Sequence, residues 1–219
     1  MQKTRCFVIA NGPSLADMGL SLLDSEVTIG TNLIGRLYTP TYYVVEDRLV
    51  IEDNAAEICA LDTIKYLPSQ AMYNLVYPMS GEVRWFTADY GYDEHAPGFA
   101  STEARLQCGA TVTYTALQLA YLMGFEQVYI IGLDHDYQMP AGAVEISPNV
   151  YMSNGDDPNH FDPAYFGAGK RFHDPKPDRM VTAYKRAREV YEAAGREILN
   201  ASTRSKTRVF KRAKLEDVL

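Results

Sequence analysis

The stretch that decides the fold reads RCFVIA-NGPSL, from Arg5 to Leu15. Its first half is a short run of β-forming residues, and Asn11-Gly12-Pro13 stops that run. Pro13 suits the first position of a helix, and Ser14 can cap a helix there. The stretch therefore predicts a buried strand that passes through a tight turn into a helical segment.

Outward from this stretch, strand-like and helix-like segments alternate along the chain. This alternation predicts one α/β domain over residues 1–219, of Rossmann-like type, with a mostly parallel sheet flanked by helices. Residues 70–107 are expected to form loops and a short hairpin or edge strand. The predicted strands cover residues 5–10, 26–30, 41–45, 63–67, 127–132 and 196–201, and the predicted helices cover a short segment to about residue 23, then 49–60, 111–123 and 179–194.

Composition and charge exclude several classes of protein. The 219 residues hold 28 acidic and 21 basic side chains, a net charge of −7, which argues against a broad nucleic-acid surface. One small anion pocket stays compatible with that charge. Cys6, Cys59 and Cys108 are odd in number and widely spaced, as expected of reduced thiols. Because no apolar run is long enough for a signal peptide or a membrane span, we expect a cytoplasmic protein.

Polar side chains stand where several predicted strands end. Asn11, Asn32, Glu46-Asp47 and Asp134-His135-Asp136 each follow such a strand. In an open parallel sheet the carboxyl ends of the strands form the ligand crevice, although strand ends are also polar simply because loops lie at the surface. Asp134 is expected to contact a ligand. Asp134 and Asp136 could share a divalent ion, but a turn in which only Asp134 faces the crevice is favoured.

The first turn is a candidate phosphate site. Gly12 would let a ligand approach the backbone, and the amides after it would meet an anion at a helix start. Asn11 adds a side-chain donor and acceptor. A plain Asn-Gly turn with a helix cap explains the same residues, and the turn matches neither GxGxxG nor a P-loop.

Residues 136–177, after the Gly132-Leu133-Asp134 strand end, form a long polar and aromatic segment that predicts a lid-like insertion or binding loop. Histidines there could serve as general acid or base, and cations could neutralise a leaving phosphate. Each of these side chains alone is also ordinary for a surface. The candidates are His160, Tyr165, Lys170, Arg171 and His173.

Several of these segments together resemble a Rossmann-like family that includes the archaeal 6-hydroxymethylpterin diphosphokinase and the motility accessory factors, which are implicated in glycosylating flagellin. The resemblance covers nearly the whole chain. The segments are Val8-Ile-Ala-Asn-Gly-Pro-Ser-Leu15, residues 111–124, Val128-Tyr-Ile-Ile-Gly-Leu-Asp134, Asp157-Pro-Asn-His160 and Tyr165-Phe-Gly167.

The same landmarks are similar to those of the Campylobacter-type sialyltransferases, which use a CMP-activated sugar without metal. That similarity implies a nucleotide-binding donor site and a catalytic histidine in the lid, for which His160 and His173 both fit. Two departures are visible: Thr111-Val112-Thr113 replaces Thr-Ser-Gly, and Glu46-Asp47 replaces an asparagine and would repel a sialic acid carboxylate. The implied donor-binding residues are Asn11, Gly12, Pro13, Ser14, Asn32, Asp47, Thr111, Thr113, Tyr165, Lys170 and Arg171, and Asp134 joins the histidines as a catalytic candidate.

Three functions follow as expectations. The first is a glycosyltransferase that uses a CMP- or other nucleotide-activated sugar in surface glycan synthesis and acts on a small-molecule or glycan acceptor. The second is a diphosphokinase acting on a hydroxymethylpterin with ATP and Mg²⁺, the metal being held by Asp47, Asp134 and Asp136. The third is a non-catalytic nucleotide-binding module. No metal is favoured for the first, and the sialyltransferase relatives suggest a homo-oligomer.

Overall fold

The computed structural model describes residues 4–91 and 97–219 of the chain. Nine strands in the described residues form one sheet in the order β12-β11-β7-β1-β2-β3-β4-β5-β6, and every neighbouring pair is parallel. This confirms the α/β fold with a parallel sheet. The strands are β1 (Arg5–Ile9), β2 (Thr28–Thr31), β3 (Tyr42–Val44), β4 (Ile64–Pro68), β5 (Val83–Asp89), β6 (Arg105–Gln107), β7 (Gln127–Ile131), β11 (Glu197–Asn200) and β12 (Lys211–Arg212).

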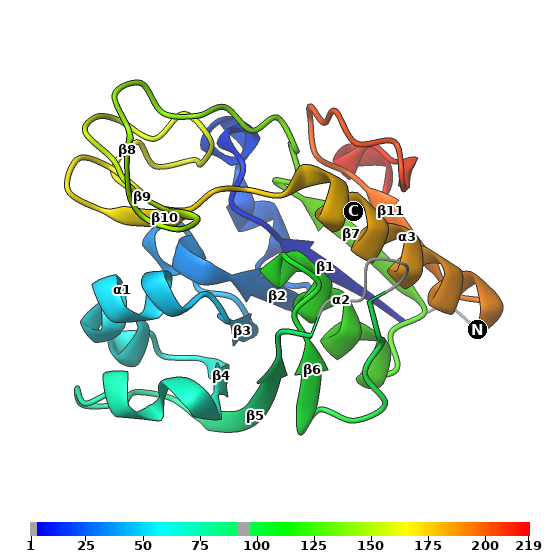
Figure 1. Cartoon of the computed structure of the whole chain (residues 1–219). Coiled ribbons are helices and arrows are strands. Elements are labelled where there is room, and N and C mark those ends of the chain that lie inside the picture. Colours follow the sequence, from blue (N-terminus) through cyan, green and yellow to red (C-terminus); the bar gives the residue numbers. More distant parts are fainter. Residues whose placement is uncertain (1–3, 92–96) are drawn as a thin grey trace.

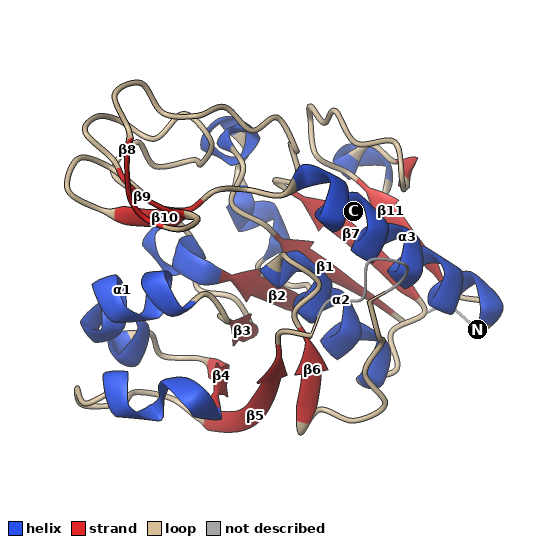
Figure 2. Cartoon of the chain, in the orientation of Figure 1, coloured by secondary structure: helices blue, strands red, loops and turns tan. Residues whose placement is uncertain are grey.

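Helices cover both faces of this sheet (Figures 1 and 2). Cys6 and Val8 of β1 pack into the core beneath α2 (Val112–Leu122) and α3 (Pro177–Ala193). The alternate residues of β1, Phe7 and Ile9, pack into the second core with α1 (Arg48–Ala60) and short 3-10 helices. Strands buried on both faces are continuous apolar runs, which is why β1 and β7 are recognisable in the sequence.

Most predicted elements agree with the structure to within two residues, and two segments agree only in part. The helical segment after the first turn is two 3-10 helices, η1 (Pro13–Asp17) and η2 (Leu20–Leu23). In residues 70–107 the expected short edge strand is confirmed as β6, which stands at the edge of the main sheet, but the parallel strand β5 beside it was not predicted, and residues 92–96 lie outside the described part of the chain. In β5 only Phe86 and Ala88 are buried, so its sequence carries a weak apolar signal, and pairing with β4 determines its place.

The segment between β7 and α3 is not structureless. Its centre is a three-stranded antiparallel sheet in the order β10-β9-β8, formed by β8 (Val144–Ser147), β9 (Val150–Met152) and β10 (Arg171–His173). This small sheet lies beside the carboxyl-end side of the main sheet, with β10 against α1 (Figure 1). It follows the Gly-Leu-Asp strand end, where the sequence predicted an insertion.

The chain order of the strands creates a crevice beside β1. The chain runs outward from β1 to β6 on one side and then returns to place β7 on the other side of β1. At such a reversal the connections leave in opposite directions, and ligands of open α/β sheets bind outside the carboxyl ends of the strands there. Among residues 4–91 and 97–219, no helix has the length and apolar character needed to cross a bilayer.

Candidate functional site

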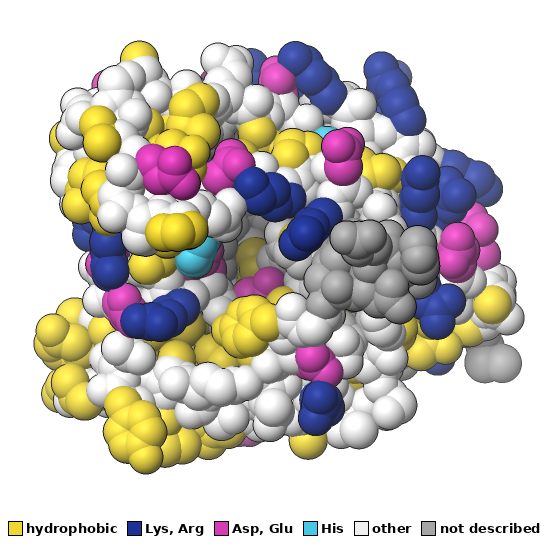
Figure 3. All heavy atoms as spheres, viewed as in Figure 1, with side chains coloured by type: hydrophobic (Ala, Val, Ile, Leu, Met, Phe, Trp, Pro, Cys, Tyr) yellow, Lys and Arg dark blue, Asp and Glu magenta, His cyan; other side chains and the backbone are white. Residues whose placement is uncertain are grey.

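A cavity of about 1360 Å³ lies at the carboxyl ends of the strands. Asn11 and Gly12 reach its wall from the end of β1, Asn32 from the end of β2, and Asp134 from the end of β7. The space-filling view shows this face hollowed, with acidic side chains inside the hollow and Lys, Arg and a histidine around it (Figure 3). The polar strand ends noted in the sequence therefore do meet in one place.

The cavity brings together most, but not all, of the predicted site residues. Those on its wall are Asn11, Gly12, Pro13, Asn32, Asp47, Thr111, Thr113, Asp134, Asp136, His160 and His173. Four others do not line it. Ser14 and Tyr165 are buried, while Lys170 and Arg171 bond to Asp53 of α1 and hold β10 against that helix.

The first turn is used within the protein. The Asn11 side-chain amide donates to the Thr31 carbonyl at 3.1 Å and to its hydroxyl at 2.8 Å. The Gly12 amide donates to the Gly132 carbonyl at 2.8 Å. A Cβ on Gly12 would stand 2.5 Å from that carbonyl oxygen, so the glycine is needed for the close approach of β1 to the end of β7. Contacts within the protein thus require a glycine at position 12, and the approach of a ligand to its backbone stays a prediction.

Asp134 occupies the position that the sequence assigned to a phosphate. The Ser14 amide donates to Asp134 Oδ2 at 2.7 Å, and the Ser14 hydroxyl donates to Oδ1. Ser14 is only 1% exposed. Because this carboxylate already satisfies the start of η1, an anionic ligand has to bind elsewhere on the wall.

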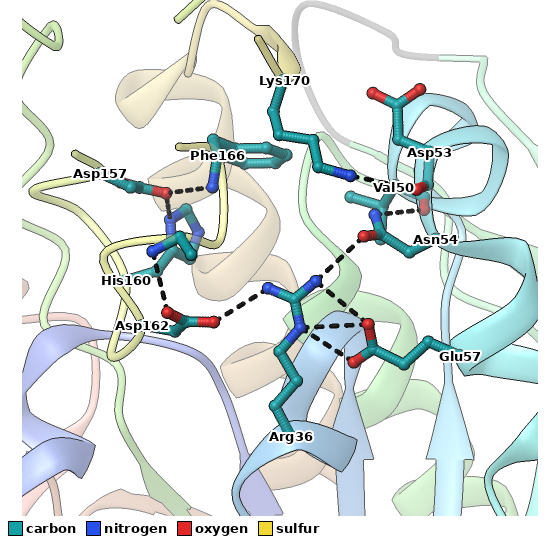
Figure 4. A network of polar contacts seen from close by, with 11 residues as sticks. Arg36, Val50, Asp53, Asn54, Glu57, Asp157, His160, Asp162, Phe166 and Lys170 are labelled. Carbon is teal, nitrogen blue, oxygen red and sulfur yellow. Dashed lines mark hydrogen bonds and ion pairs between the residues drawn. The ribbon is translucent and has the colours of Figure 1, made fainter. Parts of the chain in front are cut away.

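His160 is held in a fixed orientation by a buried carboxylate. Its Nδ1 lies 2.7 Å from Asp157 Oδ2 (Figure 4). Its ring stacks on Tyr165 with centroids 3.9 Å apart. Burial by itself would raise the pKa of Asp157, but the hydrogen bonds from His160 and from the amides of Asn159 and Phe166 keep that pKa below its ordinary value. Since Nδ1 faces a carboxylate, Nε2 is the nitrogen left to exchange a proton with a ligand.

His173 stands in a more open position on the same wall. Its Nδ1 is 3.3 Å from Asp47 Oδ2, and this hydrogen bond raises the pKa of His173 above its ordinary value. Asp47 also caps α1, accepting from the Leu49 amide at 2.8 Å and the Val50 amide at 3.2 Å. The two histidines thus differ: His160 is enclosed and oriented, while His173 is exposed and paired with a helix cap.

Besides α1, which Asp47 caps, the helices α2 and α3 also begin at the cavity. Residues around the starts of α2 and α3 line it, and neither N-cap, Thr111 or Lys176, makes a side-chain capping hydrogen bond. Gly109 and Ala110, just before α2, both have positive φ angles, 55° and 65°. Helix N-termini attract anions through their free amides and their dipole. This wall, rather than the first turn, has the electrostatics suited to a phosphate.

Two features of the site were not predicted from the sequence. Glu46, after β3, is 6% exposed and lines the cavity, and burial raises the pKa of its carboxyl to about 8. Its position at a strand end was visible, but its burial depends on α2, which arrives much later in the chain. Lys176, Arg204 and Lys206 also line the cavity; Lys176 lies three residues after His173, while Arg204 and Lys206 belong to a segment far from the other candidates.

The three carboxylates expected for magnesium are engaged separately. Asp47 caps α1, Asp134 bonds to Ser14, and Asp136 lies 2.6 Å from Lys206 Nζ. Within the described parts of the chain, no three His, Cys, Asp or Glu side chains are grouped so that they could hold a metal ion. The arrangement therefore offers no ready magnesium cluster built from these residues.

Comparisons of the chain with protein-family models, with curated proteins and with solved structures found no match. The functional argument accordingly depends on the geometry of the cavity and on the residues that line it.

Proposed function

We propose that this protein is a transferase that takes a group from a nucleotide donor, in its leading form a glycosyltransferase using a CMP- or other nucleotide-activated sugar. One observation carries the proposal. An enclosed histidine, His160, oriented by the buried Asp157, opens on a cavity at the carboxyl ends of β1 and β7. A base fixed by a carboxylate beside a nucleotide-type crevice suits proton removal from an acceptor hydroxyl.

The size of the cavity supports two substrates. Pockets for single small ligands measure roughly 300–1,000 Å³, and this cavity measures about 1360 Å³. A nucleotide-linked sugar and part of an acceptor both fit a space of that size. Asn11 and Asn32 would face the nucleotide at the ends of β1 and β2.

The phosphate of the donor belongs at the starts of α2 and α3 in this proposal. Thr111 and Thr113 lie at the first of these starts, and Lys176 at the second. Arg204 and Lys206 line the same cavity with side chains 65% and 70% exposed, so they can swing toward an anion. Helix amides and cations would together neutralise the charge that the leaving phosphate gains.

The reaction then needs one proton transfer. The acceptor oxygen attacks the donor carbon, the bond from that carbon to the phosphate oxygen breaks, and the nucleotide leaves with the bonding electrons. His160 takes the acceptor's proton, and Asp157 stabilises the resulting imidazolium. In this mechanism Asp134 has a structural role rather than a catalytic one, because its carboxylate accepts hydrogen bonds from Ser14.

The proposal places this chemistry in the cytoplasm. Cys6, Cys59 and Cys108 are all free and buried, as expected in a reducing compartment. A homo-oligomer, which the family resemblance implies, would be detected by light scattering on the purified chain.

Calorimetry with CMP, CTP, UDP and ATP, each with and without Mg²⁺, tests the donor. Binding of a pyrimidine nucleotide without metal is the expected result. A strict metal requirement together with preference for ATP would contradict it and support the diphosphokinase instead. Failure of every nucleotide to bind at millimolar concentration would remove the transferase proposal.

Replacement of His160 tests the catalytic part. His160→Ala should keep nucleotide affinity within about threefold and reduce turnover of the bound donor by about 10²–10⁴-fold, the range for loss of a general base. His173→Ala, on the same wall, is the matched comparison and should reduce turnover less. Full activity of His160→Ala would exclude this mechanism.

A further inference from the structure

Glu46 is a buried carboxyl on the cavity wall with no cation beside it. Its Oε2 accepts a hydrogen bond from the hydroxyl of Thr115, a fully buried residue of α2. Among residues 4–91 and 97–219, no Lys or Arg forms an ion pair with it. A carboxylate left unpaired in such a place is costly, so the uncharged acid is the favoured form.

The groups that face Glu46 do not supply the missing positive charge. Asp47 is its neighbour in the chain, and the Tyr90 hydroxyl donates to the Glu46 backbone carbonyl at 2.9 Å. Cys108, just after β6, and Tyr184 of α3 also lie close to the Glu46 carboxyl. Burial raises the pKa of Tyr90, Cys108 and Tyr184, so these three stay protonated at neutral pH.

Positive charge lies instead around the edge of the cavity. Arg48, Lys176, Arg204 and Lys206 line it with side chains 44–77% exposed. Figure 3 shows Lys and Arg around the hollow and acidic side chains within it. An elongated ligand with one anionic end would bind with that end among the edge cations and its other end toward Glu46.

We propose that Glu46 selects the group that the donor carries: its carboxyl hydrogen-bonds an uncharged, hydroxyl- or amide-bearing group and, once ionised, excludes a carboxylate. This inference rests on the proposed nucleotide-donor site. An uncharged carboxyl both donates and accepts a hydrogen bond, which matches a hydroxyl or an amide. Once ionised, the same group repels a carboxylate across a site with little water.

The selection depends on pH, because burial raises the pKa of Glu46 to about 8. Between pH 7 and pH 9 the group gains its charge, and discrimination against a carboxylated donor rises. His173 also loses a proton above its ordinary range, since Asp47 raises its pKa. A variant of Glu46 and a variant of His173 are therefore needed to separate the effects of these two titrations.

Two ligand pairs test the inference by calorimetry at pH 7, 8 and 9. UDP-glucose and UDP-glucuronate differ only by a hydroxymethyl group in place of a carboxylate, and CMP is compared with CMP-N-acetylneuraminate. The measured quantity is the Kd of the carboxylated ligand divided by the Kd of its partner. In the wild type this ratio should rise by up to about tenfold from pH 7 to pH 9, the limit set by the ionisation of a single carboxyl whose pKa is about 8.

The variants decide the cause. In Glu46→Gln the ratio should stay flat across this range, while His173→Asn should retain the rise. Glu189→Gln, an exposed substitution on α3, is the matched control and should behave as wild type. If Glu46→Gln fails to fold, Thr115→Val removes the hydroxyl that lowers the pKa of Glu46 and should move the rise to higher pH.

The outcomes separate the two proposals. A ratio that is equal in wild type and Glu46→Gln, with nucleotides bound, overturns the selection by Glu46 and leaves the donor site standing. Absence of binding by UDP and by all four ligands of these pairs overturns the donor site, and the selection by Glu46 is overturned with it.

Discussion

Single residues at the end of β1 show how closely the protein packs around its own cavity. Gly12 approaches the end of β7 so closely that a Cβ would lie 2.5 Å from the Gly132 carbonyl oxygen and 2.8 Å from Asp134 Cγ. Its φ of −64° is open to any residue, so the restriction at this position is steric rather than conformational. The neighbouring Ser14 is bound to the same carboxylate.

Gly12→Ala should therefore lower the free energy of unfolding by about 1–3 kcal/mol, the cost of forcing a methyl into a filled site. Urea unfolding followed by circular dichroism measures the change. Gly19→Ala is the control, because nothing lies within 4 Å of the Cβ it would add. Equal stability of the two variants would contradict the tight joint between β1 and β7.

At the scale of elements, Arg36 connects the His160 loop to helix α1. The guanidinium bonds to Glu57 and Asn54 of α1 and to Asp162, two residues after His160 (Figure 4). Asn54 interrupts the regular helix, with φ of −136° and ψ of 24°. The loop that presents His160 is thus fixed to α1 by one side chain with three partners.

Arg36→Met should leave Asp162 without its cation and loosen residues 157–166. We expect faster hydrogen exchange of amides in that loop, roughly tenfold, with exchange in β1 and β7 unchanged, because the loss is local. Arg48→Met is the matched control, since its pair with Glu52 is an exposed i,i+4 contact. Unchanged exchange at 157–166 would show that the loop is held by other contacts.

The sequence predicted those elements whose own residues determine their burial. β1 and β7 are continuous apolar runs, and α2 carries an apolar stripe that ends at Gly124, so each was recognisable. β5 was not predicted because only Phe86 and Ala88 of this strand are buried, and its position is determined by backbone pairing with β4. Site residues at strand ends could be predicted from their positions in the sequence. The hydrogen bond from the Ser14 amide to Asp134 could not, because it joins residues 120 positions apart and leaves no local pattern in the sequence.

At the scale of the whole molecule, one buried carboxyl links stability to pH. The pKa of Glu46 is about 8 in the folded protein, chiefly through burial, against an ordinary value of 4.5. Between these values the folded chain holds a proton that the unfolded chain has lost. The stability that Glu46 contributes is therefore fully present below the lower value and is lost as pH rises through the window.

We expect the free energy of unfolding to fall between pH 5 and pH 8, with Glu46 contributing up to roughly 1.4 kcal/mol per pH unit. Glu46→Gln should reduce this slope by the same amount. Urea unfolding at pH 5, 6, 7 and 8 measures both chains. An identical slope in the variant would assign the dependence to other groups.

The central position of β1 has a consequence for synthesis on the ribosome. β2 follows β1 within about twenty residues, but β7, its other neighbour, begins at Gln127. While the nascent chain grows, one edge of β1 stays unpaired, and an unpaired apolar edge invites aggregation. The Ser14 contact also has to wait for Asp134 to emerge. Folding yield in the cell should thus depend on how quickly residues up to β7 are synthesised, or on a chaperone that covers the unpaired edge of β1 until then.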